Sequence, residues 1–179
     1  MDTSIRTLVV VSLSFLLAAP LSGQKEKREP LTGTQQDKIA EAGIDPVARI
    51  DLYVKFTGEH ADTIKSLIKR AKGSARSHRI DDELKDFTAL MDELGDNLDV
   101  YSQRHADLRL SLKALNEGVA QWQGVLHDLP SEPGFELSLK EALDSNADLV
   151  DLAKRITADQ EAYFKAHPEK KGQDRAEPK

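Results

Sequence analysis

The chain has 179 residues, a mass of 19.8 kDa and a formal net charge of −6 from 25 basic and 31 acidic residues. This length suits a single domain, and the acidic balance argues against nucleic acid as a partner, because polyanion-binding proteins carry a basic excess. The absence of cysteine excludes disulfides, thiolate metal sites, a cysteine nucleophile and a cysteine-linked lipid anchor.

The first 23 residues have the pattern of a secretory signal peptide. Arg6 precedes a twelve-residue apolar stretch at 8–19, and Gly23 ends the segment as a small residue suited to cleavage. A helix over that stretch would span about 18 Å, which is too short for the roughly 30 Å hydrocarbon core of a bilayer. We therefore expect cleavage after Gly23, no stable membrane span afterwards, and a periplasmic or secreted location.

Residues 24–44 are expected to form a flexible leader that contains one short helix. The helix is predicted over 35–42, with Thr34 as its N-cap and Gly43 just past its end.

A long amphipathic helix is predicted over 46–72, with Asp45 as N-cap and Pro46 in the first turn. Apolar or small residues recur in alternating steps of three and four, which is the spacing of a helix that packs along its whole length. The members of this seam are Val47, Ile50, Val54, Thr57, Ala61, Ile64, Ile68, Ala71 and Ala75.

The stretch 80–129 shows the most regular pattern, with Asp81 as a candidate N-cap and Pro130 as its end. One helix of this length would be a rod of about 75 Å. We favour a continuous or gently bent helix, and the alternative is a break near 95–105, where Gly95 and the polar segment 102–105 lie. A rod would leave apolar flanks that favour a homodimer, whereas a break would let one copy close about four helices by itself.

A last long helix is predicted over 135–165, with Asn146 and Gln160 as polar seam positions that could fix its register. Residues 166–179 are polar and expected to be a disordered tail. No segment alternates with a period of two. The prediction is therefore an all-α domain over 45–165, an antiparallel bundle of three to four long amphipathic helices with disordered termini.

Charge placement suggests how the first two long helices meet. Basic residues gather between Lys65 and Arg79, and acidic residues gather between Asp81 and Asp99. A hairpin that turns near 73–80 would lay these segments side by side in an antiparallel pair. Since exposed ion pairs stabilise a fold by under about 1 kcal/mol each, the pattern bears on topology rather than on stability.

The sequence offers no catalytic, cofactor-binding or metal site that we would assign. Phosphate-binding loops, nucleophile elbows and helical His-Glu-x-x-His motifs are absent. Several residues were weighed, and a structural or surface role is the favoured interpretation for each. They are His60 with Glu59 and Asp62, the seam histidine His105, the acidic residues Asp92, Asp96 and Asp99 with Glu93 beside them, and Trp122.

Two resemblances can be stated. The pentamer Leu31-Thr32-Gly33-Thr34-Gln35 resembles the Leu-Thr-x-x-Gln motif of the Spy/CpxP-like periplasmic proteins, which implies an all-helical protein of envelope stress, chaperoning or metal sensing. The stretch 45–53 and the Leu129-Pro130 pair are similar to uncharacterised secreted helical bacterial proteins, a likeness that covers most of 45–165 and implies fold and location only.

The expected function is that of a non-enzymatic extracytoplasmic helical protein that acts by protein–protein contact. The alternative is a Spy/CpxP-like periplasmic chaperone or a metal-responsive envelope-stress protein. We expect no cofactor and no nucleic acid; a protein partner and a homodimer are the associations considered. An exposed apolar patch would favour the contact or chaperone roles, and convergent histidine and acidic side chains would favour the metal-responsive one.

Overall fold

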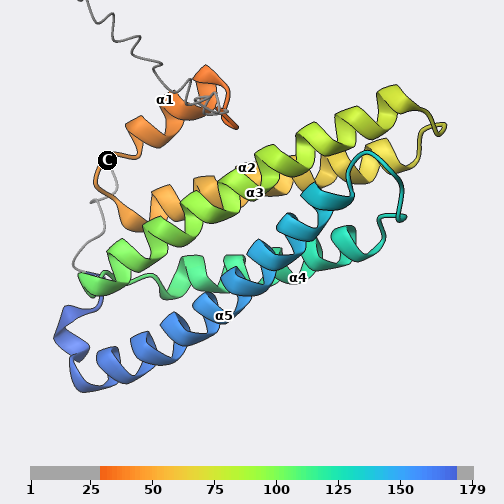
Figure 1. Ribbon diagram of the computed structural model, residues 1–179. Coiled ribbons are helices and arrows are strands. Elements are labelled where there is room, and N and C mark those ends of the chain that lie inside the picture. The colour runs from red at the N-terminus through yellow and green to blue at the C-terminus, as the bar shows by residue number, and fades with distance from the viewer. Residues whose placement is uncertain (1–28, 173–179) are drawn as a thin grey trace, which may run out of the picture.

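The structure, a computed structural model, describes residues 29–172. Within this range every regular element is a helix (Figure 1), which confirms the all-α prediction. The predicted signal peptide, the start of the leader and residues 173–179 lie outside the described residues. The elements are α1 (Gly33–Glu41), α2 (Pro46–Ile68), α3 (Ser74–Gln103), α4 (Arg109–His127), α5 (Glu136–Ala166) and the 3₁₀ turn η1 (Pro168–Lys170).

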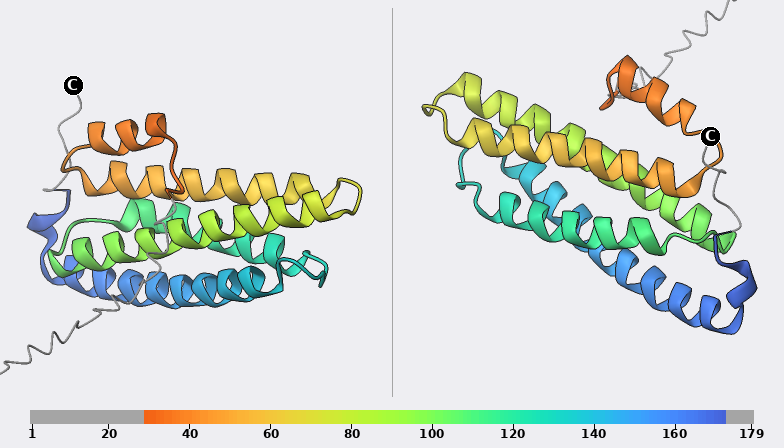
Figure 2. Two further views of the ribbon diagram at one scale, coloured as in Figure 1. Left: turned by 45° about the horizontal axis from the view of Figure 1, so that its top comes forward. Right: turned by 180° about the vertical axis from the view of Figure 1, so that it is seen from behind.

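The four long helices lie side by side, and the short α1 lies outside them against α2 (Figure 2). α2 packs against α3 and α4, and α5 packs against the same two helices. The α2–α3 turn and the α4–α5 loop lie at one end of the molecule, and the α3–α4 link lies at the other (Figure 1). Among the described helices, α3 and α4 are therefore consecutive in the chain without being neighbours in space.

Most of the core consists of residues that the step pattern predicts, but the predicted seam residues Ala71 and Ala75 are exposed, and Leu90, outside the pattern, is fully buried. Trp122 is 3% exposed and meets Phe87 edge to face, with ring centroids 5.8 Å apart, so its packing role is confirmed. Full burial of one large apolar side chain stabilises a fold by about 1.5–3 kcal/mol. The predicted residues of α3 and α4 that lie in the core are Ile80, Leu84, Phe87, Met91, Leu94, Leu98, Leu112, Leu115, Val119, Trp122 and Leu126.

The prediction of a continuous helix over 80–129 was wrong. α3 ends at Gln103 and α4 begins at Arg109, so the chain breaks at the end of the segment that we considered as the alternative. Gly95, the other candidate, lies inside α3 and causes no break. Because the helix is broken, a single copy packs four long helices together, and the argument from helix length no longer favours a dimer.

His105 departs from the predicted seam. Its φ of 55° places it in the left-handed region, and its side chain is exposed. Among residues other than glycine, histidine is one of those enriched in this region. The turn directs Ala106 and Leu108 into the core instead, at 3% and 0% exposure.

The hairpin between α2 and α3 is tighter than predicted. α2 ends at Ile68 rather than near 72, and α3 begins at Ser74 rather than near 80. The buried Arg76 explains the early end, because its guanidinium donates to the carbonyl oxygens of Ile68 at 3.3 Å and Arg70 at 3.5 Å. These carbonyls at a helix end otherwise lack partners.

The predicted start of α2 is correct, and that of α1 is displaced. Asp45 caps α2 by accepting from the backbone N–H groups of Val47 at 3.0 Å and Ala48 at 3.1 Å. The N-cap of α1 is Thr32, not Thr34. Thr32 and Gln35 form a capping box in which each side chain accepts from the other residue's backbone N–H.

The segment expected to be a disordered tail begins with ordered structure. α5 continues to Ala166, η1 follows, and the backbone N–H of Gly172 donates to Asp107 Oδ2 at 3.0 Å. The contact ties residues after α5 to the α3–α4 link. Residues 173–179 of the expected tail remain outside the described range.

Charged residues near the hairpin pair differently from the predicted pattern. Lys72 and Arg76 both pair with Glu132 of the α4–α5 loop. At the other end of the acidic run, Asp99 pairs with Arg155 of α5 at 3.0 Å. The opposite charges therefore tie the α2–α3 hairpin to the α5 side of the molecule.

Candidate functional site

The α3–α4 link is held by one side chain from α5. Gln160 accepts from the backbone N–H of Leu108 at 2.9 Å and donates to the carbonyl oxygen of Ala106 at 2.5 Å. Gln160 is 3% exposed, so both bonds satisfy backbone groups that water does not reach. The prediction that Gln160 is a buried polar seam residue is confirmed. Asn146 is equally buried, but its Oδ1 has no hydrogen-bond partner among the described residues.

An ion pair between the buried carboxylate of Asp107 and the half-buried Arg109 joins the link to α4. Asp107 is 3% exposed and accepts from Arg109 Nε at 2.8 Å and from a terminal nitrogen of the same guanidinium at 2.9 Å. Hydrogen bonding to Asp107 raises the pKa of the Arg109 guanidinium. The guanidinium also lies 4.7 Å from the centre of the Phe164 ring, which is within the range of a cation–π contact. Arg109 thus fixes the start of α4 against the end of α5.

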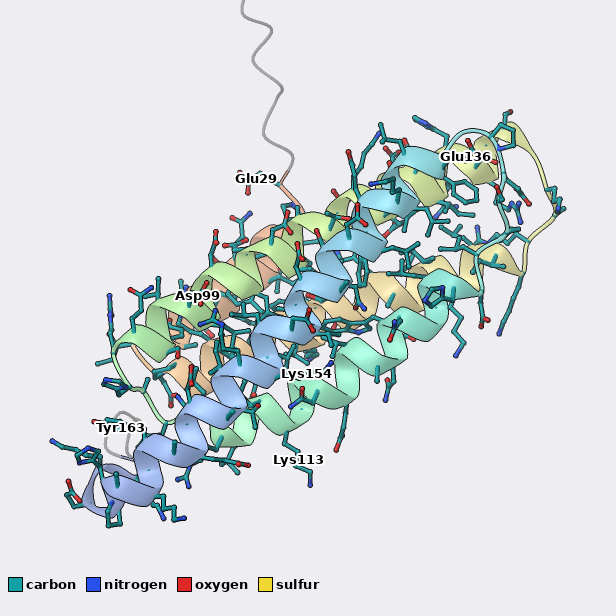
Figure 3. All side chains as sticks on the ribbon, turned by 60° about the horizontal axis from the view of Figure 1, so that its bottom comes forward. Glu29, Asp99, Lys113, Glu136, Lys154 and Tyr163 are labelled. Carbon is teal, nitrogen blue, oxygen red and sulfur yellow. The ribbon has the colours of Figure 1, made fainter. Side chains whose placement is uncertain are left out.

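A polar cavity of about 390 Å³ opens beside the link, between α3 and α5. His105 and Tyr163 stack on its wall, with ring centroids 4.1 Å apart. Asp99, Arg155 and Asp159 supply charge, with Asp99 and Arg155 already paired. The ring stack gives exposed His105 a packing role, in place of the buried, hydrogen-bonded role expected from the seam. Figure 3 shows Tyr163 near the end of α5 and Asp99 on α3.

A second, more apolar groove of about 620 Å³ runs between α4 and α5. Its lining includes Leu112 and Ala120 together with three exposed charged residues, Lys113, Glu117 and Glu161. None of these three makes an ion pair with another described residue. Figure 3 shows Lys113 projecting from α4 away from the packed helices.

Two other polar residues of the groove bond within the chain: Arg109 pairs with Asp107, and Thr157 bonds its own helix. Thr157 on its α5 wall donates its hydroxyl to the carbonyl oxygen of Ala153 at 2.7 Å, within the same helix. On α4, the apolar residue Leu110 lies three residues before Lys113 and is 60% exposed. An apolar floor beside unpaired charges suits contact with another helix surface. Sequence reasoning missed this groove, because it forms only where α4 and α5 meet.

The acidic residues of α3 serve different neighbours. Asp92 accepts from Ser145 of α5 at 2.9 Å and Asp99 pairs with Arg155, whereas Glu93 accepts from the Tyr53 hydroxyl of α2 at 2.7 Å. Burial, with the Glu93 hydrogen bond adding to it, raises the pKa of Tyr53. Asp96 lines a shallow depression between α3 and α5. The charge pattern predicted that these acidic residues would face the helix over 46–72, but Asp92 and Asp99 bond α5 and Glu93 bonds α2.

The histidine cluster considered from the sequence does not converge. His60 Nδ1 lies 2.8 Å from Glu83 of α3 and its Nε2 lies 3.2 Å from the Pro30 carbonyl oxygen. Glu59 accepts instead from Gln35 of α1 at 2.9 Å. Adjacent helix positions point in different directions, as expected.

A different trio does converge at the start of α3. One ligand atom from each of His78, Asp81 and Asp82 lies within 4.8 Å of the others. Burial opposes ionisation of Asp81, but hydrogen bonds from Lys85 and Ser138 outweigh it and lower the pKa of the carboxyl. The spacing of i, i+3 and i+4 with one histidine is the signal that could have revealed this trio in the sequence.

Comparisons with protein-family models, curated proteins and solved structures find no match to this chain. Within the described residues, no helix is both long and apolar enough to span a membrane. The functional conclusion therefore depends on the geometry of the grooves and side chains described above.

Proposed function

We propose that this chain is a non-enzymatic, extracytoplasmic helical protein that acts by protein–protein contact through the α4/α5 groove. The observation that carries this proposal is the groove itself, with its apolar floor and the three charged residues that have no ion pair among the described residues. Protein partners supply apolar area and complementary charge together, which this surface matches. The role needs no cofactor and no nucleic acid.

The proposed fold is an antiparallel bundle built from two hairpins. Tyr53 meets Glu93, and His60 meets Glu83, so residue numbers on α2 rise as those on α3 fall. By contrast, Asp92 meets Ser145 and Asp99 meets Arg155. These pairs favour two antiparallel hairpins, α2/α3 and α4/α5, with parallel packing between α3 and α5. This arrangement leaves the outer faces of α4 and α5 available for contact.

The occupant that we assign to the groove is a second copy of the chain. Leu110, Lys113 and Glu117 are spaced three and four residues apart, so they share one face of α4. If two copies of α4 cross in antiparallel orientation with their centre near residue 115, Lys113 lies opposite Glu117 of the partner subunit, and the reverse pair also forms. The same symmetry covers the exposed Leu110 in each copy.

Charge exchange tests this homodimer. Lys113→Glu and Glu117→Lys alone each place like charges opposite one another and should lower the mass measured by light scattering towards that of a monomer. The double variant restores opposite charges and should restore the dimer. Lys55→Glu, at an exposed position of α2 outside the groove, serves as the control. A wild-type monomer at tens of micromolar, or a double variant that stays dissociated, would contradict this occupant.

The extracytoplasmic location of the protein is part of the same proposal. It depends on the predicted signal peptide, which lies outside the described residues. Mass spectrometry of the protein from its native envelope should find Gln24, or the pyroglutamate formed by its cyclisation, at the N-terminus. Recovery of the protein with an intact Met1 from a purely cytosolic fraction would contradict the extracytoplasmic location, whether or not the chain forms a dimer.

A second candidate is a Spy/CpxP-like chaperone or a metal-responsive envelope-stress protein. Convergence of His78, Asp81 and Asp82 favours the metal-responsive form, since imidazole and carboxylate are ligands of Zn²⁺. Lys85 pairs with Asp81 at 2.6 Å and would have to move. Titration calorimetry with Zn²⁺ should then show binding that His78→Ala abolishes and His127→Ala leaves intact; no heat with the wild type would remove this candidate.

The Leu-Thr-x-x-Gln resemblance has a structural explanation that does not require a chaperone role. Leu31 is buried, Thr32 and Gln35 form the capping box, and Gln35 also bonds Glu59 of α2. The motif thus starts α1 and holds it on α2. Among the described residues, the large apolar side chains that remain exposed are Ile44, Val100, Leu110 and Leu137, which come from different parts of the chain.

A further inference from the structure

Residues 29–41 form a strap on the outside of the bundle. The strap consists of a short extended segment and α1, and it lies against α2 (Figure 2). Leu31 and Ile39 are its buried apolar residues, at 9% and 6% exposure. A segment that buries so little apolar surface depends strongly on its polar contacts to stay in place.

Three polar contacts join the strap to α2. Gln35 Nε2 donates to Glu59 Oε2 at 2.9 Å, and a guanidinium nitrogen of Arg49 donates to the Ile39 carbonyl oxygen at 3.0 Å. The third is between His60 Nε2 and the Pro30 carbonyl oxygen, at 3.2 Å. His60 also reaches α3, because its Nδ1 lies 2.8 Å from Glu83 Oε2. Of the three residues of α2 that contact the strap, His60 is the one that also contacts α3.

Both ring nitrogens of His60 face acceptors. A carbonyl oxygen and a carboxylate can accept hydrogen bonds but cannot donate them, and a neutral imidazole has only one N–H. The doubly protonated ring satisfies both neighbours, whereas the neutral ring leaves a lone pair facing one of the two oxygens. We propose that protonated His60 latches the strap to α2 and α3, and that loss of this proton releases the strap.

The surroundings of His60 make it the natural switch. The carboxylate of Glu83 is the charged group in contact with the imidazole ring, and the His60 side chain is 16% exposed. Other charged residues on neighbouring turns are Glu29 in the strap, Glu59 on α2, and Arg79 and Asp86 on α3. Carboxylates and arginine keep their charge between pH 5 and 8, while histidine titrates there. The latch therefore strengthens as pH falls and weakens as pH rises.

Release has a defined structural consequence. It would expose Leu31 and Ile39 and uncover the α2/α3 surface beneath them, where the buried Tyr53 bonds Glu93. A cavity of about 360 Å³ already lies between the strap and this surface. Leu31 and Ile39 belong to the core cluster, but the other buried residues of that cluster come from 50–156 and would keep the four long helices packed. An extracytoplasmic protein meets the pH of its surroundings, so the device would respond to external acidity.

Hydrogen exchange followed by mass spectrometry tests the latch on the full chain. Protection of the α1 amides, corrected for intrinsic exchange rates, should fall roughly tenfold between pH 5.5 and 7.5, as expected for loss of one hydrogen bond to a charged group. Protection of the α4 amides should stay constant over the same range. In His60→Gln, which cannot be protonated, α1 protection should not change with pH.

Two further variants make the result decisive. His127→Gln, at an exposed position at the end of α4, should keep the wild-type pH dependence. Glu83→Gln removes the carboxylate that favours the protonated ring, so its release should shift to lower pH, which a merely structural role would not produce. A wild-type strap with equal protection at both pH values, or the same fall in His60→Gln, would overturn the proposal.

Discussion

The link between α3 and α4 should depend on Gln160 more than on any local feature of the link. Replacing Gln160 by alanine leaves the Leu108 N–H and the Ala106 carbonyl without partners in a dry environment. Each unsatisfied buried backbone group costs about 1–3 kcal/mol, so the free energy of unfolding should fall by roughly 2–6 kcal/mol for the two groups. The alanine also leaves a cavity, which adds to this loss.

Gln160→Met separates the two effects, because methionine fills a similar volume without making hydrogen bonds. Urea unfolding, followed by circular dichroism and by the fluorescence of the single tryptophan, Trp122, measures the loss. We expect Gln160→Met to lose about 2 kcal/mol, and Asp159→Ala, next to it but exposed, to stay within about 0.5 kcal/mol of wild type. A methionine variant as stable as wild type would refute the reasoning.

Two further predictions concern the core and the hairpin end. Leu112→Asp, at a position 2% exposed, should cost about 4 kcal/mol in thermal or urea unfolding, whereas Leu137→Asp, 69% exposed and outside the α4/α5 groove, should stay within about 0.5 kcal/mol; equal effects would place Leu112 outside the core. The Arg76 hydrogen bond, with a second from Lys72, lowers the pKa of the Glu132 carboxyl. The ionised Glu132 carboxylate therefore stabilises the fold above the ordinary glutamate pKa of about 4.3, and this stabilisation is lost as the pH falls below that value. Glu132→Gln should lower the Tm at pH 7 but not at pH 3, and an equal decrease at both values would contradict the ion pair.

Much of the fold could be predicted because burial leaves a periodic trace in the sequence. Leu84, Phe87 and Met91 recur in steps of three and four, and these are the residues that the structure buries. Caps were predictable where a single side chain decides them, as Asp45 does for α2. The α1 cap was displaced by two residues, because Thr32 and Thr34 have the same chemistry and only the reciprocal bond with Gln35 distinguishes them.

The surfaces that carry the proposals could not be predicted in this way. The α4/α5 groove brings Lys113 and Glu117 beside Glu161, which comes from another helix. The strap contact joins Pro30, His60 and Glu83, from three separate elements. A pattern along one helix indicates which residues are buried, but it does not indicate which helix lies opposite. The trio of His78, Asp81 and Asp82 is the exception, since it lies on a single helix.

The break between α3 and α4 shows most clearly why local pattern is insufficient. The steps of three and four continue through Tyr101, His105 and Leu108. Leu108 is buried after the turn, as it would also be in a straight helix, so the step pattern does not reveal the break. No proline or glycine marks the turn, and His105 takes the left-handed position that glycine usually fills. The backbone groups freed by the break find their partner in Gln160, 52 and 54 residues further along the chain. Ending one helix and starting another leaves backbone groups that need new partners, and Gln160 of α5 supplies two of them, so part of the signal for the break lies in α5 rather than at the link.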